Sequence, residues 1–192
     1  MNQVMDRVHG VLSDISRAAV WVGGLALMLS AVMVTGDVIM RKLFGITISG
    51  SDEISGYVFA AATTWAYSFC LLNRANIRID AVYNQMGLRT RAVLDLVGLA
   101  ALTYYVYLLA VSSVGVLSES LEYDSSAQTT LATPLWIPQI FWVTGLCFFL
   151  VCLAFLCVYG LYALARTDWS TINRIAGIKS VEEEIAEETF VN

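Results

Sequence analysis

Residues 96–118, LVGLAALTYYVYLLAVSSVGVLS, decide the fold of this chain, because 23 consecutive residues carry no charge. Asp95 and Glu119 bracket the stretch. An α-helix needs about 20 predominantly apolar residues to cross the hydrocarbon core of a bilayer. The stretch therefore predicts a membrane-spanning helix.

Three more charge-free runs, at 18–36, 54–73 and 125–165, indicate further spans. The last run opens with the polar segment SSAQTTLATP, so its membrane part is placed at about 135–165. Only 14% of the 192 residues are charged, against about 25% in a soluble domain. We therefore predict an all-α integral membrane protein whose transmembrane domain, 18–165, contains four helices. Their expected ranges are about 18–40, 54–72, 92–117 and 135–165.

Residues 1–17, MNQVMDRVHGVLSDISR, have the pattern of an amphipathic helix. At 100° per residue, the apolar side chains fall within an arc of about 120°, and the charged ones lie opposite. Because a span follows directly, we expect this segment to form a separate helix lying in the membrane interface.

The distribution of Lys and Arg predicts the orientation of the spans. In a four-span topology, both termini and the second loop share one side of the membrane. That side carries nine bases, and the other side carries two, Arg41 and Lys42. The side with nine is expected to be cytoplasmic, so both termini should be cytoplasmic.

The C-terminal segment, 166–192, is predicted to be a cytoplasmic acidic tail. Five of the sixteen acids of the chain lie within 182–188, and they account for the net charge of −5. A solvated tail is the simpler interpretation, and a docking segment is the alternative. The chain has no basic stripe, so we expect no nucleic acid partner.

The residue types that would hold a cofactor or perform catalysis are scarce. His9 is the single histidine, which excludes a bis-histidine haem site within this chain. The four cysteines lie in predicted spans, where they are expected to pack as small apolar residues: Cys70, Cys147, Cys152 and Cys157. Phosphate-loop, HExxH and GxSxG motifs do not occur. We expect no enzyme activity and no cofactor or metal in this chain.

Asp52 and Glu53 stand where the second span begins. Acids are favoured in the first turn of a helix, because the N-terminus presents free N–H groups and a partial positive charge. Ser49 or Ser51 could cap this helix, and Arg41 could supply a counter-charge. Capping alone and capping combined with a partner contact both remain open.

The second loop is rich in arginine. These side chains are expected to set the topology and to bind lipid phosphate: Arg78, Arg89 and Arg91.

The middle of each predicted span lacks ionisable side chains. Asp37 and Asp95 lie near span ends, where we expect them to reach the headgroups. Transporters with an internal pathway usually place ionisable groups or broken helices at mid-depth. We therefore expect no polar pathway within these four helices alone.

Three segments together resemble the small membrane subunit of tripartite ATP-independent periplasmic (TRAP) transporters, the DctQ-like family. They are RKLFGITISGSDEISGYVF at 41–59, LLNRANIRID at 71–80 and TTLATPLWIPQIFWVTG at 129–145. Their order and spacing make the set more specific than any one of them. Asn76 departs from the pattern, because many members have His at this position.

The resemblance implies a scaffold subunit that anchors a large permease subunit in the bacterial inner membrane. It also implies that the permease holds the sodium and substrate sites, and that a periplasmic binding protein delivers an organic acid. Carried over by motif position, the implied contact residues are Arg41, Gly50, Asp52, Glu53, Arg74, Asp80, Pro134, Trp136 and Pro138. Which of these touch the partner, and which hold this chain's own loops, is left open. The alternative function is a self-sufficient four-helix carrier or channel, assembled as a homo-oligomer.

Overall fold

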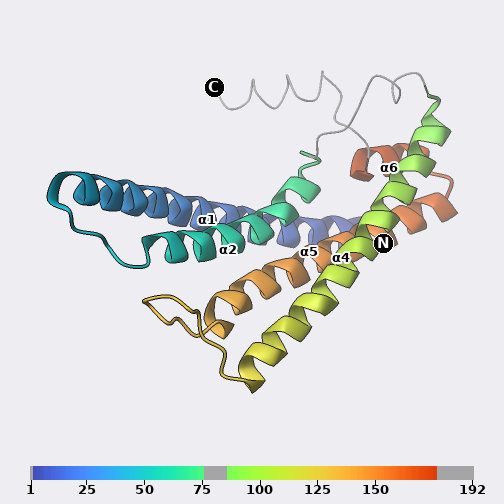
Figure 1. Cartoon of the computed structure of the whole chain (residues 1–192). Coiled ribbons are helices and arrows are strands. Elements are labelled where there is room, and N and C mark those ends of the chain that lie inside the picture. The colour runs from blue at the N-terminus through green and yellow to red at the C-terminus, as the bar shows by residue number, and fades with distance from the viewer. Residues whose placement is uncertain (1, 76–85, 177–192) are drawn as a thin grey trace, which may run out of the picture. The chain divides into compact units, whose positions relative to one another are not determined.

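The computed structural model describes residues 2–75 and 86–176, and every regular element in these ranges is a helix. The helices are α1 (Asn2–Phe44), α2 (Ser51–Leu72), α4 (Leu88–Glu122), α5 (Trp136–Ala165) and α6 (Trp169–Ala176) (Figure 1). The chain divides into two compact units, residues 1–69 with 106–151 and residues 70–105 with 152–192. Each unit is described by itself.

Three of the described helices, α1, α4 and α5, are long and apolar enough to cross a membrane. The helix α2 is not among them, although its 22 residues would extend about 33 Å. Threonine, serine, glycine and aromatic residues dilute its apolar character. The predicted span at 54–72 is therefore helical, but its composition does not confirm that it crosses the membrane.

The helix α1 corrects the predicted boundary between residues 17 and 18. It runs without interruption from Asn2 to Phe44, so no turn separates an interfacial helix from the following span. Arg17, Ala18 and Ala19 favour a helix, and nothing at this point breaks one. The helix is about 65 Å long, against a hydrocarbon core of about 30 Å, so part of α1 lies outside the core.

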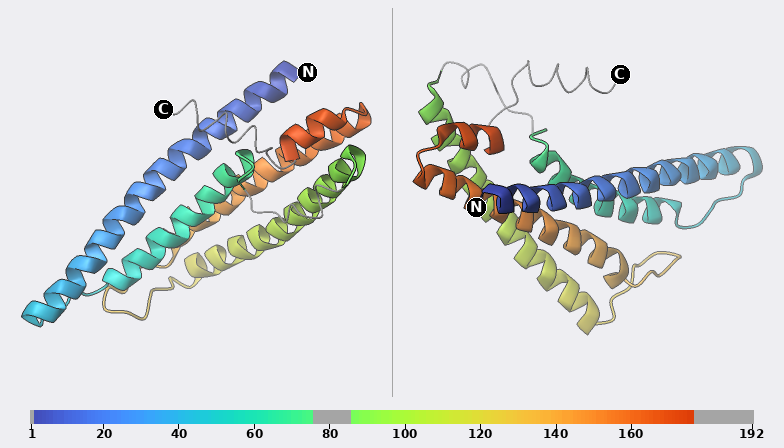
Figure 2. Two further views of the ribbon diagram at one scale, coloured as in Figure 1. Left: turned by 90° about the horizontal axis from the view of Figure 1, so that it is seen from above. Right: turned by 180° about the vertical axis from the view of Figure 1, so that it is seen from behind.

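In the first unit, α2 packs closely against α1 and α5. Gly23 of α1 faces Ala62, where an added Cβ would lie 3.2 Å from the alanine Cβ; Figure 2 shows these two helices side by side. On α5, Gly145 lies against Thr64 and Trp65. The rings of Trp65 and Phe148 stack with centroids 5.4 Å apart. Small residues let the helices approach closely at both crossings.

In the second unit, α6 is part of a small core. Ile172 of α6 is fully buried with Ala92 of α4 and Ala163 of α5. Asp168 caps the helix, because its carboxylate accepts a hydrogen bond from the Thr171 N–H at 3.1 Å. The predicted tail at 166–192 therefore begins with a packed helix, and its acidic residues 182–188 lie outside the described residues.

All four cysteines are free thiols, and they differ in exposure. Cys152 is fully buried, and Cys157 lies 3.2 Å from the Thr103 hydroxyl.

Candidate partner-binding site at the helix ends

The loop after α1 and the loop before α5 meet at one end of the first unit. We define the loop cluster as residues 45–50 and 123–135 together with Asp37, Arg41, Glu53 and Tyr57. The Ser49 and Thr130 hydroxyls share a hydrogen bond across 81 positions of sequence. The two loops therefore lie on the same side of the helices, as expected if the predicted first and third loops face the same compartment.

Asp37 organises the first of these loops. Its side chain is 1% exposed, and it forms an ion pair with Arg41 one helical turn later. It also accepts a hydrogen bond from the backbone N–H of Ile48 at 2.5 Å and one from the Ser51 hydroxyl. One carboxylate thus joins the end of α1, the loop and the start of α2. The expectation that Asp37 reaches lipid headgroups is wrong, because its oxygens are held by the chain itself.

Glu53 joins the start of α2 to the loop before α5. Its carboxylate accepts hydrogen bonds from the Thr129 hydroxyl and from the Tyr57 hydroxyl, the latter at 2.8 Å. The Thr129 hydrogen bond, followed by that of Tyr57, lowers the pKa of Glu53 below its ordinary value. Both hydroxyls stabilise the charged form. Glu53 therefore holds two loops of its own chain together.

Both the backbone conformation at position 50 and the packing around it require glycine. Its φ of 89° lies in the left-handed region that favours glycine. The Leu131 side chain also occupies the space that a Cβ would need. The Gly50 carbonyl accepts the first helical hydrogen bond, from Ile54 at 3.0 Å. Gly50 rather than Ser49 or Ser51 thus occupies the cap position of α2, because both serine hydroxyls bind elsewhere.

Arg41 of the loop cluster and Asp52 beside it both carry exposed charges. Asp52 lies in the first turn of α2, where the helix N-terminus favours an acid. Arg41 pairs with Asp37 and keeps its side chain 53% exposed. The expected pairing of Arg41 with Asp52 or Glu53 is absent from the described ion pairs. Both side chains remain accessible to a partner.

The start of α5 is fixed by a short backbone pairing. Ser126 and Pro134 form an isolated β-bridge, and the Leu135 N–H donates to the Ser125 carbonyl at 3.0 Å. Pro134 and Trp136 are exposed at this end, whereas Pro138 is half-buried. Pro138 lies in the first turn of α5, where a missing N–H breaks no helical hydrogen bond. The proline therefore does not break the helix.

The second loop is described only at its two ends. Arg74 follows α2 with φ 54°, and the Ala75 N–H donates to the Cys70 carbonyl at 2.9 Å. This geometry ends a helix with a left-handed residue. Beyond the loop, Arg89 is exposed, whereas Arg91 donates to the Met86 carbonyl at 2.8 Å. Asn76, Arg78 and Asp80 lie outside the described residues.

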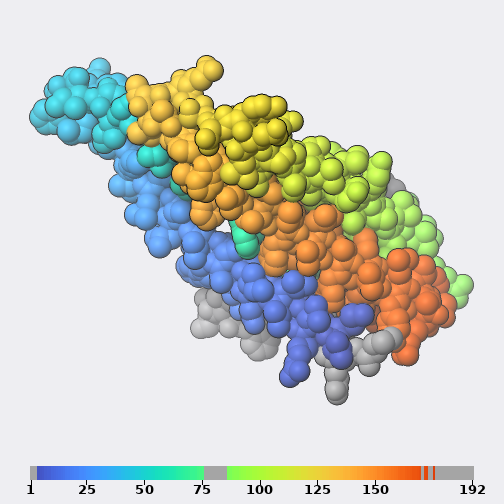
Figure 3. Space-filling view, turned by 90° about the horizontal axis from the view of Figure 1, so that it is seen from below, coloured from blue at the N-terminus to red at the C-terminus, as the bar shows by residue number. Residues whose placement is uncertain are grey.

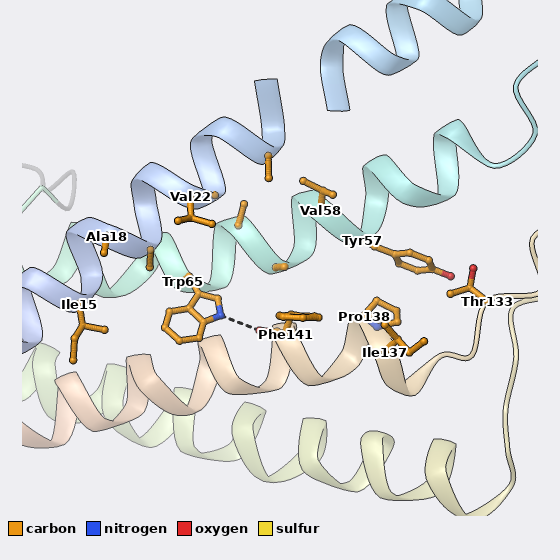
Figure 4. A pocket seen from close by; sticks show the side chains of 15 residues that line it. Ile15, Ala18, Val22, Tyr57, Val58, Trp65, Thr133, Ile137, Pro138 and Phe141 are labelled. Atoms are coloured by element: carbon orange, nitrogen blue, oxygen red, sulfur yellow. Dashed lines mark hydrogen bonds between the residues drawn. The ribbon is translucent and has the colours of Figure 1, made fainter. Parts of the chain in front are cut away.

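An apolar cavity of about 610 Å³ lies between α1, α2 and α5. Figure 4 shows Ile15, Ala18 and Val22 of α1 lining it, with Tyr57 and Thr133 near one end. The Trp65 indole N–H, also at the wall, already donates to the Phe141 carbonyl at 3.0 Å. The lining is therefore almost free of unpaired polar groups.

The site presents exposed side chains to a partner, and hydrogen bonds within the chain hold its loops in place. In the ranges 2–75 and 86–176, no three His, Cys, Asp or Glu residues gather closely enough to hold a metal ion. Sequence reasoning identified Glu53 and Gly50, but it missed the hydrogen-bonding roles of Asp37, Ser49 and Thr129. The spacing of Asp37 and Arg41, one helical turn apart at the end of a predicted span, was the available signal for Asp37. The partners of Ser49 and Glu53 lie 81 and 76 positions away, and the sequence carried no signal for them.

The family model for tripartite ATP-independent periplasmic transporters, DctQ component, matches residues 30–167. The chain belongs to the DctQ family. This match confirms the resemblance indicated by the three sequence motifs. It covers more than half of the chain and includes the whole loop cluster. No match was found among curated proteins or among solved structures.

DctQ membership and three long apolar helices together make this chain a membrane component of a transporter. The matched range begins inside α1, so residues 1–29 lie outside it. The motif residues within the DctQ match fall into two groups, those that hold the loops of this chain and those that are exposed. Gly50 and Glu53 hold the loops of this chain, whereas four others leave exposed surface: Arg41, Asp52, Pro134 and Trp136.

Proposed function

We propose that this DctQ-family chain is the non-catalytic scaffold subunit of a sodium-coupled secondary transporter. It binds and anchors a large multi-span permease subunit in the bacterial inner membrane. The permease takes up an organic acid that a periplasmic binding protein delivers. Sodium binds in the permease, and this chain holds no cofactor.

The observation that carries the proposal is the family match combined with the uncharged middle of each long helix. Residues 18–36 of α1, 96–118 of α4 and all of α5 contain no charged side chain. Transporters with an internal pathway for ions and charged solutes usually place ionisable groups or broken helices at mid-depth. These helices are therefore suited to support a pathway that another subunit provides.

The loop cluster is the proposed place of contact with the other components. The side chains that contact the permease are Arg41, Asp52, Pro134 and Trp136. The local structure that positions these side chains depends on Gly50, Glu53 and Pro138. Arg74 ends α2 and so sets where the second loop leaves the helix. Asp80 belongs to the same proposed contact set by motif position. On the opposite side of the membrane, Arg78, Arg89 and Arg91 bind lipid phosphate.

Co-purification tests the scaffold role directly. The chain and the large permease subunit are expressed together, extracted in mild detergent and purified through a tag on this chain. We expect both subunits in one complex. Recovery of the chain alone, while the co-expressed permease remains active, would refute a scaffold role.

Flux measurements separate this proposal from the self-sufficient carrier or channel. Vesicles containing this chain alone are expected to show no sodium-dependent uptake of organic acids, whereas vesicles with both membrane subunits and the binding protein take them up. Uptake or proton flux by the chain alone would favour the carrier.

A further inference from the structure

The apolar cavity between α1, α2 and α5 opens to the outside of the helices. All of its lining residues belong to the first unit. Figure 3 shows atoms of α2, in teal, between α1, in blue, and α5, in orange. The volume of about 610 Å³ lies within the range of sites that hold small molecules, about 300–1,000 Å³. The cavity is therefore large enough to bind a ligand.

Small side chains leave this space between the helices. They are Ala18, Ala19, Gly23, Ala26, Ala61 and Ala62. Water is a poor occupant, because it needs polar partners, and the Trp65 indole N–H at the wall already donates to the Phe141 carbonyl. An empty space would cost the lining its dispersion contacts on one side. The occupant that suits the cavity is therefore apolar.

The length of the cavity favours a lipid tail over a helix. Along α1 the lining runs from Ile15 to Ala26, which is about 16 Å. One leaflet of the hydrocarbon core is about 15 Å deep. A transmembrane helix, whether from another subunit or from a second copy of this chain, would run through about 30 Å. The cavity matches the depth of one leaflet, as an acyl chain does.

The charges at one end of the cavity indicate which headgroup the lipid carries. Tyr57 and Thr133 line this end, and both hydroxyls donate to the Glu53 carboxylate. Asp52 is exposed next to Glu53, whereas the base Arg41 is already in an ion pair within the chain. Acids attract an ammonium group and repel a headgroup with net negative charge. This end therefore favours a headgroup that carries an amine.

We propose that the cavity binds one acyl chain of a zwitterionic phospholipid with an ammonium headgroup, such as phosphatidylethanolamine. The acyl chain lies between α1 and α5, against α2, and the ammonium group lies beside Glu53. The bound lipid fills the space that the small side chains leave. This inference goes beyond the scaffold function and does not depend on it, because it requires only that the chain lies in a membrane.

Tryptophan fluorescence in bilayers tests the inference, because bromine atoms on an acyl chain quench a nearby indole. The signal of Trp65 is the difference between wild type and Trp65→Phe. We expect occupancy by brominated phosphatidylethanolamine to exceed that by brominated phosphatidylglycerol about threefold, the contribution of one exposed ion pair. Trp21 is the control, measured with Trp21→Phe: it is 77% exposed outside the cavity lining, and both lipids should quench it equally. Equal quenching of Trp65 by both lipids would overturn the headgroup assignment, and quenching by neither would show that protein closes the cavity.

Filling the cavity gives a second, independent result. Ala18 is exposed at the cavity wall, so the larger side chain of Ala18→Trp can enter the space without displacing a buried residue. In native mass spectrometry of the full chain, wild type is expected to retain one phosphatidylethanolamine and Ala18→Trp to lose it. Ala31→Trp is the matched control, because Ala31 is exposed on α1 outside the lining. Equal retention of lipid by the two variants would contradict binding in the cavity.

Glu53→Gln separates the headgroup from the tail. The amide oxygen can still accept hydrogen bonds from Tyr57 and Thr129, but the charge is lost. We expect the variant to bind lipid in the same amount and to lose the preference for phosphatidylethanolamine over phosphatidylglycerol. A preserved preference would overturn the role of Glu53.

The same fluorescence measurement with the permease present identifies a competing occupant. If the permease abolishes quenching of Trp65, one of its helices occupies the cavity, and this inference fails while the scaffold function stands. If the chain binds lipid but no permease, the scaffold function fails and this inference stands.

Discussion

At the scale of single residues, two carboxylates hold the loop cluster together, and they do so differently. Asp37 is buried and bonds a guanidinium, a backbone N–H and a serine hydroxyl close in sequence. Glu53 is partly exposed and accepts hydrogen bonds from the Tyr57 hydroxyl of its own helix and from the Thr129 hydroxyl, 76 positions away. Because each acid has partners from more than one segment, loss of either one should loosen the loops.

Replacing Asp37 should lower the thermal stability of the purified chain. Asp37→Ala removes the partner of Arg41 and the acceptor of the Ile48 N–H, which leaves that N–H unpaired. We expect the unfolding temperature in detergent to fall by several degrees, and Asp37→Asn to fall less, because its amide oxygen can still accept from Ile48. Asp52→Asn, at an exposed position, is the control and should change little. Equal unfolding temperatures for Asp37→Ala and wild type would contradict this role.

Glu53 should make the loop cluster sensitive to acid. Its pKa is lowered from the ordinary 4.5, chiefly by the Thr129 hydroxyl. A lowered folded-state pKa stabilises the fold above pH 4.5, and this contribution is lost as the pH falls through the folded pKa. The difference in unfolding temperature between wild type and Glu53→Gln should thus be fully present above pH 4.5 and shrink as the pH falls through the lowered pKa of Glu53. A difference that persists unchanged into acid would show that ionised Glu53 does not stabilise the loops.

At the scale of elements, charge-free runs predicted the helix positions because apolar composition and helix formation coincide in a membrane. The helix α5, Trp136–Ala165, starts one residue after the predicted start. The continuity of α1 was missed because an amphipathic segment and an apolar segment are equally compatible with one helix. The contacts of the loop cluster could not be predicted, since they depend on how two loops meet in space.

The crossing of α2 and α5 at Gly145 should tolerate no larger residue. An added Cβ would lie 2.5 Å from the Thr64 hydroxyl oxygen and 2.8 Å from the Trp65 ring. We expect Gly145→Ala to destabilise the fold by about 1–3 kcal/mol through overpacking, measured by unfolding in detergent. Gly56→Ala on α2 is the matched control, because no atom lies within 4 Å of its added Cβ, and it should be neutral or slightly stabilising. Equal stability of the two variants would show that α2 and α5 do not pack closely at Gly145.

At the scale of the whole molecule, the number of membrane crossings depends on α2. The helices α1, α4 and α5 are apolar enough to cross a membrane, whereas α2 is less apolar and does not meet the same criterion. If α2 crosses, the chain has four spans and its termini share a side. If α2 does not cross, the chain has three spans and its termini lie on opposite sides. The hydrogen bond between Ser49 and Thr130 favours four spans, because it joins the loop before α2 to the loop before α5.

Reporter fusions decide between these topologies. An enzyme active only outside the cytoplasm, fused after Asn192, should be inactive, because nine Lys and Arg residues favour a cytoplasmic side for both termini. The same enzyme fused after Gln128, in the loop before α5, should be active, since that loop lies on the opposite side of α5. Activity at the C-terminus together with inactivity after Gln128 would keep the crossing by α5 but reverse its direction. The chain would then cross three times if its N-terminus is cytoplasmic, and α2 would lie along the membrane surface or against a partner.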